Sequence, residues 1–302
     1  MINALTYILT VLIWGSTWYA IEFQIGVVAP QWSIFYRFAL SALVMFLWVA
    51  LKRDALKIER KYHSQLFLLG LFLFSSNYLM IYFGTAYITS GLVAVCFSFL
   101  TFMNIINGRI FYGTAITREV IIGASFGLAG LILIFLPEVS ALSLADRTTV
   151  GIIFCLIGAT SASLGNAVAS SKRLSDLPIL SMNAWGMLYG ALINLIFAIL
   201  SGEPMRFEWT TDYVGSLIIL AILGTVIAFV MYLSLMAKIG MTKISYVGVL
   251  LPLVALSIST IFGDYRWTIE ALLGLVLIVL GNVIIIKFKA KAPPAKPLEA
   301  AE

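Results

Sequence analysis

Charged residues are scarce in this sequence of 302 residues. Asp, Glu, Lys and Arg together make up 11% of the positions, whereas 62% of the positions are hydrophobic. Soluble globular domains carry about 25% charged residues. The shortage excludes an ordinary soluble domain, and the mean hydropathy of +1.04 indicates a chain that is largely embedded in lipid.

Cysteine and histidine are nearly absent. Cys96 and Cys155 lie inside apolar runs, and the single histidine, His63, lies in a basic segment. Zinc sites need closely spaced Cys and His ligands, and phosphate-binding loops need a glycine-rich stretch followed by Lys. We therefore expect no enzyme, no cofactor and no metal site. The net charge of +5 comes from scattered Lys and Arg, so no nucleic-acid partner is expected either.

Long apolar runs account for most of the chain. A membrane helix needs about 20 apolar residues to cross the hydrocarbon core, and these runs are too continuously apolar for the strands of a membrane barrel. The ten runs are 4–24, 31–51, 65–83, 88–110, 118–136, 150–170, 178–200, 213–235, 243–263 and 268–288. The sequence predicts an all-α integral membrane protein of ten transmembrane helices with short connections.

The basic residues predict the orientation of these spans. With the N-terminus inside, fifteen of the nineteen Lys and Arg residues fall on the cytoplasmic side, as the positive-inside rule requires. We expect a multi-pass protein of the plasma (inner) membrane with both termini cytoplasmic (N-in, C-in). The segment 289–302, rich in Pro and Ala, is expected to be a disordered cytoplasmic tail.

The second half of the chain repeats the first. The Thr-Arg-Glu segment at 117–119 recurs as Thr-Ile-Glu at 268–270, an offset of 151 residues, and Tyr82 recurs as Tyr232 at an offset of 150. Five spans per copy is an odd number, so the second copy is inverted. We predict two inverted five-helix repeats over 1–140 and 141–288. Such repeats suit alternating access, although a duplication kept for packing alone is the alternative.

Several landmarks point to a known family. They are Trp14-Gly15-Ser16-Thr17-Trp18 in the first span, Pro30 followed by Arg37-Phe38 and Ala42 in the second, and Pro252 followed by Gly263-Asp264 in the ninth. With the ten spans and the repeat, the sequence resembles the drug/metabolite transporter (DMT) superfamily, specifically its ten-helix EamA type, which includes YddG-like exporters. It departs from the family pattern at Thr101, Tyr112-Gly113 and Asp264, where the family often has Pro, Gly-Glu and Glu.

The resemblance implies a central cavity between the two halves, rocking alternating access, and export of amino acids, drugs or other metabolites. It does not identify the substrate, and some members of the family import.

Polar and aromatic side chains in the middle of the spans form the candidate substrate site. A polar group in hydrocarbon is costly unless it is paired or faces a cavity, and Trp14, Thr17 and Trp18 share one helix face. The candidate substrate-binding residues are Trp14, Thr17, Trp18, Arg37, Asn77, Tyr78, Tyr82, Ser98, Thr101, Trp185, Tyr232 and Tyr246. For Ser98 and Thr101 the alternative is helix packing along a stripe of small residues. We expect about half of the aromatic residues within the spans to reach the cavity.

Glycine recurs along the fifth and tenth spans. Gly123, Gly127 and Gly130, together with Gly274 and Gly281, allow close helix packing. One location for that packing is a contact between two copies of the chain in a dimer.

Arg37 is the most informative residue because a guanidinium about 9 Å inside the outer boundary needs a partner. We expect Glu22 to supply it. Arg37 then either clamps the first two spans together or biases the cavity towards carboxylate-bearing substrates. No carboxylate lies deep in a span, which favours facilitated movement or exchange over tight proton coupling.

The sequence therefore predicts a secondary (non-ATP) transporter that exports small organic metabolites, namely amino acids, related metabolites or amphiphilic drugs. One alternative is uptake of a quaternary amine such as choline, or of a nucleotide-type metabolite. Another is a non-transporting membrane sensor or assembly protein. The expected partners are the small-molecule substrate and the lipid bilayer, with the chain as a monomer or homodimer.

Overall fold

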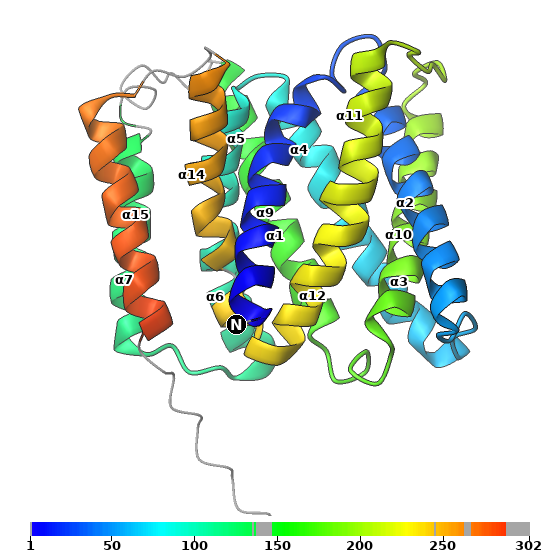
Figure 1. Cartoon of the computed structure of the whole chain (residues 1–302), viewed down its shortest axis with the longest axis horizontal. Helices are drawn as coiled ribbons and strands as arrows, with labels where there is room; N and C mark the ends of the chain where they lie inside the picture. Colours follow the sequence, from blue (N-terminus) through cyan, green and yellow to red (C-terminus); the bar gives the residue numbers. More distant parts are fainter. Residues whose placement is uncertain (1, 135, 137–146, 245, 263–266, 288–302) are drawn as a thin grey trace, which may run out of the picture.

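The protein is a bundle of long, nearly parallel and antiparallel helices (Figure 1). The computed structural model describes residues 2–134, 136, 147–244, 246–262 and 267–287. The predicted tail at 289–302 and the Gly263-Asp264 pair lie outside this range. In order, the helices are α1 (Ile2–Glu22), α2 (Pro30–Lys52), η1 (Arg60–Tyr62), α3 (His63–Leu71), η2 (Phe72–Ser76), α4 (Asn77–Thr85), α5 (Ser90–Phe97), α6 (Leu100–Tyr112), α7 (Arg118–Ile134), α9 (Arg147–Ala169), α10 (Ile179–Leu200), α11 (Thr211–Ala221), η3 (Ile222–Ile227), α12 (Ala228–Ile239), α13 (Met241–Ile244), α14 (Tyr246–Ile261) and α15 (Ile269–Lys287).

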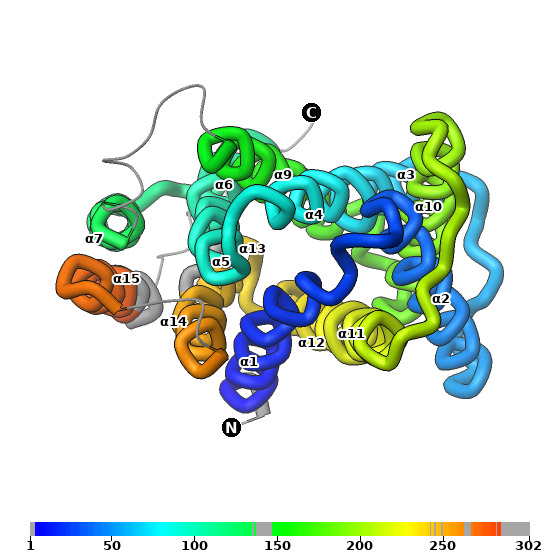
Figure 2. Tube along the Cα trace, turned by 90° about the horizontal axis from the view of Figure 1, so that it is seen from above, coloured from blue at the N-terminus to red at the C-terminus, as the bar shows by residue number. Residues whose placement is uncertain are grey.

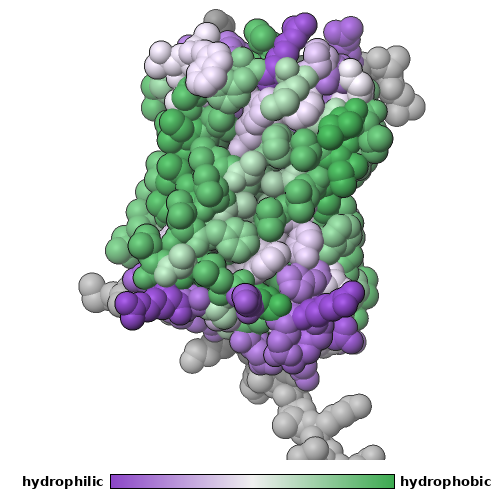
Figure 3. Space-filling view, turned by 90° about the vertical axis from the view of Figure 1, so that its right-hand side faces the viewer, coloured by the Kyte–Doolittle hydropathy of each residue, from purple (hydrophilic) through white to green (hydrophobic). Residues whose placement is uncertain are grey.

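These helices confirm the predicted all-α fold, and over the described part of the chain each of the ten predicted spans coincides with one helix or with a run of successive helices. In the fourth span, a turn at Ser98 and Phe99 separates α5 from α6. Within the described residues, seven such runs are long and apolar enough to cross a membrane, and α14 and most of α15 are shorter apolar helices. The surface carries an apolar band between two polar ends (Figure 3). This pattern is that of a multi-pass membrane protein, whose backbone must satisfy its hydrogen bonds internally.

Local sequence signals set several helix ends. Pro30 occupies the first position of α2, where its missing N–H costs nothing and its fixed φ suits the helix. Gly113 follows α6 with φ at 64°, the left-handed conformation that caps a helix C-terminus. The third and eighth spans each contain a π-helical turn at mid-length, η2 and η3, which begin at Phe72 and Ile222. These two starting residues are 150 positions apart, so both halves carry the turn at the same place in the repeat.

The helices of the two halves pack against each other rather than forming separate lobes. The most extensive helix pairs are α2 with α10, α7 with α15, α4 with α9, and α1 with α14. Each pair joins one helix of the first half to one of the second. Viewed from above, α7 and α15 stand together at one side of the bundle, while the other helices surround its centre (Figure 2). A central site is therefore built jointly by both halves.

The glycines of the fifth and tenth spans lie at the contact between α7 and α15. A Cβ atom on Gly130 would lie 2.4 Å from the Gly274 carbonyl oxygen, and one on Gly281 would lie 2.5 Å from the Gly123 carbonyl oxygen. These glycines thus bring two backbones into contact within one chain. Gly127 differs, because the nearest atom to its Cβ position is Phe102 Cζ at 3.8 Å.

α1 begins and α15 ends at the same end of the bundle (Figure 1), which we call the basal end. It corresponds to the predicted cytoplasmic side, an orientation that remains a prediction.

Candidate substrate cavity

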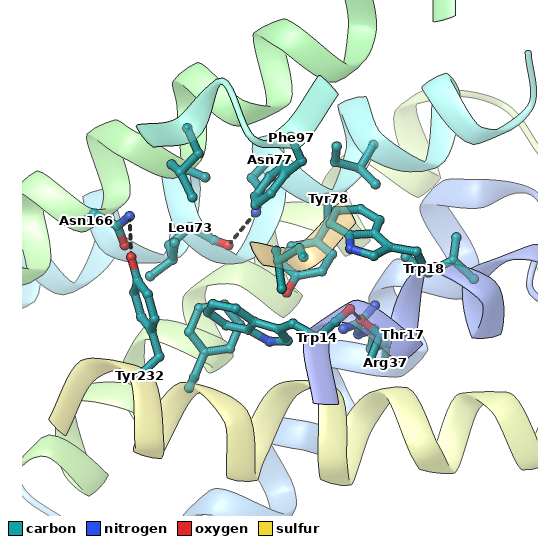
Figure 4. Close-up of a pocket in the computed structure, with 16 residues that line it drawn as sticks. Trp14, Thr17, Trp18, Arg37, Leu73, Asn77, Tyr78, Phe97, Asn166 and Tyr232 are labelled. Carbon is teal, nitrogen blue, oxygen red and sulfur yellow. Dashed lines mark hydrogen bonds between the residues drawn. The ribbon is translucent and has the colours of Figure 1, made fainter. Parts of the chain in front are cut away.

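A cavity lies in the centre of the bundle, where helices of both halves converge (Figure 4). It contains about 530 Å³ of empty space, a volume that includes open solvent, and little of that space is wide enough for a water molecule. Its lining residues are Trp14, Thr17, Trp18, Ile21, Arg37, Leu73, Asn77, Tyr78, Ile81, Phe97, Leu100, Ala162, Asn166, Phe229, Tyr232 and Leu251. The cavity is narrow, with aromatic walls and a few polar groups.

The structure brings most of the candidate residues from the sequence together at this cavity. Those that line it are Trp14, Thr17, Trp18, Arg37, Asn77, Tyr78 and Tyr232. Tyr82 is fully buried and contacts Arg37 without lining the cavity.

The other four candidates lie elsewhere. Ser98, Thr101 and Tyr246 line a separate, smaller crevice beside α7 and α15. Trp185 donates through Nε1 to the Leu56 carbonyl oxygen at 3.1 Å and packs edge-on against His63. Trp185 is therefore part of a contact between α10 and the segment before α3.

Arg37 is buried, with 1% of its surface exposed. Its Nε donates to Thr225 Oγ1 at 3.0 Å, and its Nη1 lies 3.5 Å from the Tyr82 hydroxyl. The guanidinium carbon lies 4.6 Å from the ring centroid of Tyr78. All of these partners are neutral, so they offset the desolvation of the cation only in part.

The expected pairing of Arg37 with Glu22 is wrong. Glu22 Oε1 instead accepts a hydrogen bond from the backbone N–H of Ser90 at 3.2 Å. Arg37 extends from α2 towards η3, whereas Glu22 at the end of α1 faces the start of α5. Among the described residues, the one salt bridge joins Lys61 to Glu59. Arg37 therefore holds its positive charge beside the cavity without a carboxylate partner in the described part of the chain.

Two tryptophans form much of the aromatic wall. Trp14 donates through Nε1 to the Gly224 carbonyl oxygen at 3.0 Å, and its ring lies 4.8 Å from that of Tyr232. Trp18 packs against Phe97 with ring centroids 5.1 Å apart. Such faces suit flat rings or apolar side chains.

Three further polar atoms of the cavity lining have no hydrogen-bond partner within the described residues. They are the donor Trp18 Nε1 and the acceptors Asn77 Oδ1 and Asn166 Oδ1. All three residues are more than nine-tenths buried. A buried polar atom without a partner is costly, so a ligand that pairs with these atoms gains affinity. The cavity offers one cation, one neutral donor and two acceptors without partners among the described residues.

An amide cluster closes the cavity towards the basal end. Asn166 Nδ2 donates to the Tyr232 hydroxyl at 3.0 Å and to Asn104 Oδ1 at 3.3 Å. Beyond it lies a larger hollow, with about 1940 Å³ of empty space that includes open solvent, whose lining includes Ser170 and Met236. These two residues follow Asn166 and Tyr232 by four positions each, so about one helical turn separates the hollow from the cavity.

The candidate substrate-binding residues from the sequence did not include three polar residues of this region, Asn104, Asn166 and Thr225. Asn166 was detectable, because it follows Gly165, which is 150 residues after Gly15 of the first-span landmark. Thr225 gave no comparable signal, because its importance comes from a contact with a residue 188 positions away.

Comparisons with known proteins agree with this architecture. The model of the EamA-like transporter family matches residues 1–136 and 149–287. The uncharacterized transporter YoaV of Bacillus subtilis is 26% identical over 93% of this chain and 96% of its own length. Protein PagO of Salmonella typhimurium is 21% identical over 92% of this chain and 90% of its own length. A solved crystal structure shares the fold with a TM-score of 0.73 at 17% identity, covering 94% of this chain and 96% of that one.

Proposed function

The chain belongs to the EamA-like transporter family, and we propose that it exports small organic metabolites that carry a carboxylate, amino acids foremost. As a member of this family it is a multi-pass membrane transporter and not an enzyme. In the proposal, the repeats 1–140 and 141–288 rock about the central cavity without ATP, exposing it first to one side of the membrane and then to the other.

The buried charge of Arg37 is the observation that carries the proposal. An isolated charge in the membrane interior costs several kcal/mol, and in the described structure its hydrogen-bonding partners are neutral hydroxyl groups. A carboxylate can accept two parallel hydrogen bonds from a guanidinium, which makes it the best-matched ligand. Asn77 Oδ1 supplies an acceptor for a substrate ammonium or amide N–H, and the aromatic wall accommodates the side chain.

The basal hollow supports loading from the predicted cytoplasmic side. It reaches within about one helical turn of the cavity, and the barrier between them is the hydrogen-bonded amide cluster of Asn104, Asn166 and Tyr232. Local separation of these side chains connects the hollow to the cavity. This arrangement is consistent with export, in which substrate enters from the cytoplasm.

Ligand-dependent thermal stabilisation of the purified protein tests the substrate class, because a ligand that binds the folded state raises its stability. The informative pair is L-phenylalanine and L-phenylalaninamide, compared at a pH low enough to keep both α-amino groups protonated, because they then share the ring and the ammonium group and differ in the carboxylate. We expect L-phenylalanine alone to stabilise the wild type. Arg37→Gln should abolish this shift, and Arg37→Lys should restore part of it.

Choline tests the alternative class of substrate. Stabilisation by choline that depends on Trp14 and Trp18 but survives Arg37→Gln would refute the carboxylate assignment in favour of a quaternary amine. Flux of the stabilising ligand into and out of proteoliposomes, with and without a pH gradient, then tests the direction and the coupling.

A further inference from the structure

The two π-helical turns are held at matching positions by side chains from the opposite half. Phe74 and Ser75 in η2 correspond to Gly224 and Thr225 in η3, at the offset of 150 residues. A π-helical turn interrupts the regular hydrogen bonding of an α-helix, and such turns occur often at functional sites. Inside a membrane, the carbonyl groups affected must find other donors. The side chains that hydrogen-bond to each π-helical turn therefore stabilise the part of the span where the regular helical hydrogen bonding is interrupted.

Asn194 of α10 holds η2. Its Nδ2 donates to the Phe74 carbonyl oxygen at 3.1 Å, and its Oδ1 accepts from Ser75 Oγ at 2.7 Å. Asn194 is fully buried and does not line the central cavity. A ligand in the cavity therefore leaves these two hydrogen bonds untouched.

In η3 the same two positions are held by residues that do line the cavity. Trp14 Nε1 donates to the Gly224 carbonyl oxygen, and Arg37 Nε donates to Thr225 Oγ1, each at 3.0 Å. The Thr225 hydroxyl in turn donates to the Leu220 carbonyl oxygen at 2.8 Å. A single chain of hydrogen bonds thus runs from the cavity cation into the backbone of the eighth span.

The absence of a side chain at Gly224 lets η3 pack closely against α1, because a Cβ atom at this position would lie only 2.6 Å from Thr17 Cγ2. The close approach brings α1 against η3, with the Arg37 guanidinium alongside.

We infer that Thr225 is a positioning residue that, through Arg37, couples occupancy of the cavity to the conformation of the eighth span. A substrate carboxylate competes with the Thr225 hydroxyl for the Arg37 guanidinium, and on binding it draws Arg37 away from η3. Occupancy then loosens η3, while η2 stays held by Asn194. The eighth span is the one that responds to substrate, although the two halves share the same fold. This inference rests on the proposed function, because it requires an anionic group at Arg37.

Transport kinetics of L-phenylalanine in proteoliposomes test the coupling. Thr225→Val keeps the shape of the side chain but removes the acceptor for Arg37 Nε. Thr225 then no longer competes with the substrate carboxylate for Arg37, so KM should fall roughly three- to tenfold. This factor corresponds to the free energy of one hydrogen bond inside a membrane. The turnover number should fall with KM, because tighter ground-state binding raises the barrier to the next step.

Two further variants serve as controls. Thr225→Ser retains the hydroxyl and should behave as the wild type. Ser75→Ala, at the matching position of η2, should leave KM unchanged. A higher KM with an unchanged turnover number in Thr225→Val would mean that Thr225 merely orients Arg37, which overturns the coupling, and so would unchanged kinetics.

Hydrogen exchange of the ligand-free protein tests the holding contacts without any substrate. Arg37→Gln and Trp14→Phe should speed amide exchange in peptides covering 218–230 and not in those covering 68–80, while Asn194→Ala should do the reverse. L-phenylalanine added to the wild type should speed exchange at 218–230 alone. Equal effects on both segments would overturn the inference. If the wild type binds no carboxylate, the proposed function fails, and the ligand-free exchange alone then decides whether Arg37 and Trp14 hold η3.

Discussion

The contact between α7 and α15 allows a stability prediction with a control on the same helix. In Gly130→Ala the new Cβ would lie 2.4 Å from the Gly274 carbonyl oxygen, so the helices must separate by about 1 Å to restore an ordinary contact of 3.4 Å. The atom in the way belongs to the backbone and cannot rotate aside. Overpacking of this kind costs about 1–3 kcal/mol.

The control is Gly127→Ala, three residues earlier in α7. There the nearest heavy atom, Phe102 Cζ, lies 3.8 Å from the Cβ position, so the methyl group fits without strain. Both substitutions gain up to about 1 kcal/mol of helix propensity. The difference in free energy of unfolding between the two variants therefore isolates the overpacking cost, about 1–3 kcal/mol in favour of Gly127→Ala.

Reversible unfolding in mixed detergent and SDS micelles measures this difference. Gly274→Ala probes the same contact from the other helix, because its Cβ would lie 2.5 Å from the Gly130 carbonyl oxygen. Once one methyl group has separated the helices, the second meets less resistance, so the double variant should lose less than the sum of the two single losses. Equal stability of Gly130→Ala and Gly127→Ala, or strict additivity of Gly130→Ala and Gly274→Ala, would refute the packing argument.

Three further predictions follow from the positions of individual residues. Trp185→Ala should lower the thermal stability, because the indole holds the segment before α3, yet leave KM in the flux assay unchanged. Ser98→Ala should also leave KM unchanged, because its hydroxyl donates to the Gly248 carbonyl oxygen beside another crevice; a raised KM would place it at the substrate. Tyr232→Phe should cost about 0.6–1.7 kcal/mol in detergent unfolding by removing the acceptor for Asn166 Nδ2, and no loss would argue against the amide cluster.

The sequence alone determined the number, type and approximate ends of the spans. Lipid offers the backbone no hydrogen-bonding partner, so apolar runs of this length must be helical, and the ten runs predicted the helices observed. The repeat offset of 150 residues between Tyr82 and Tyr232 predicted that matching features recur in both halves, as η2 and η3 do. Depth within a span also selected seven residues that line the cavity.

Only the tertiary structure decided which helix face meets which neighbour. The spacing of Ser98 and Thr101 marks a polar face, but Ser98, in the turn between α5 and α6, and Thr101, in α6, line a crevice beside α7 instead of the central cavity. The partner of Arg37 was equally hidden, because Glu22 is closer in sequence while Thr225 lies 188 residues away. Periodicity reports the faces of one helix, whereas partners depend on the packing of all helices, to which residues far apart in the chain contribute together.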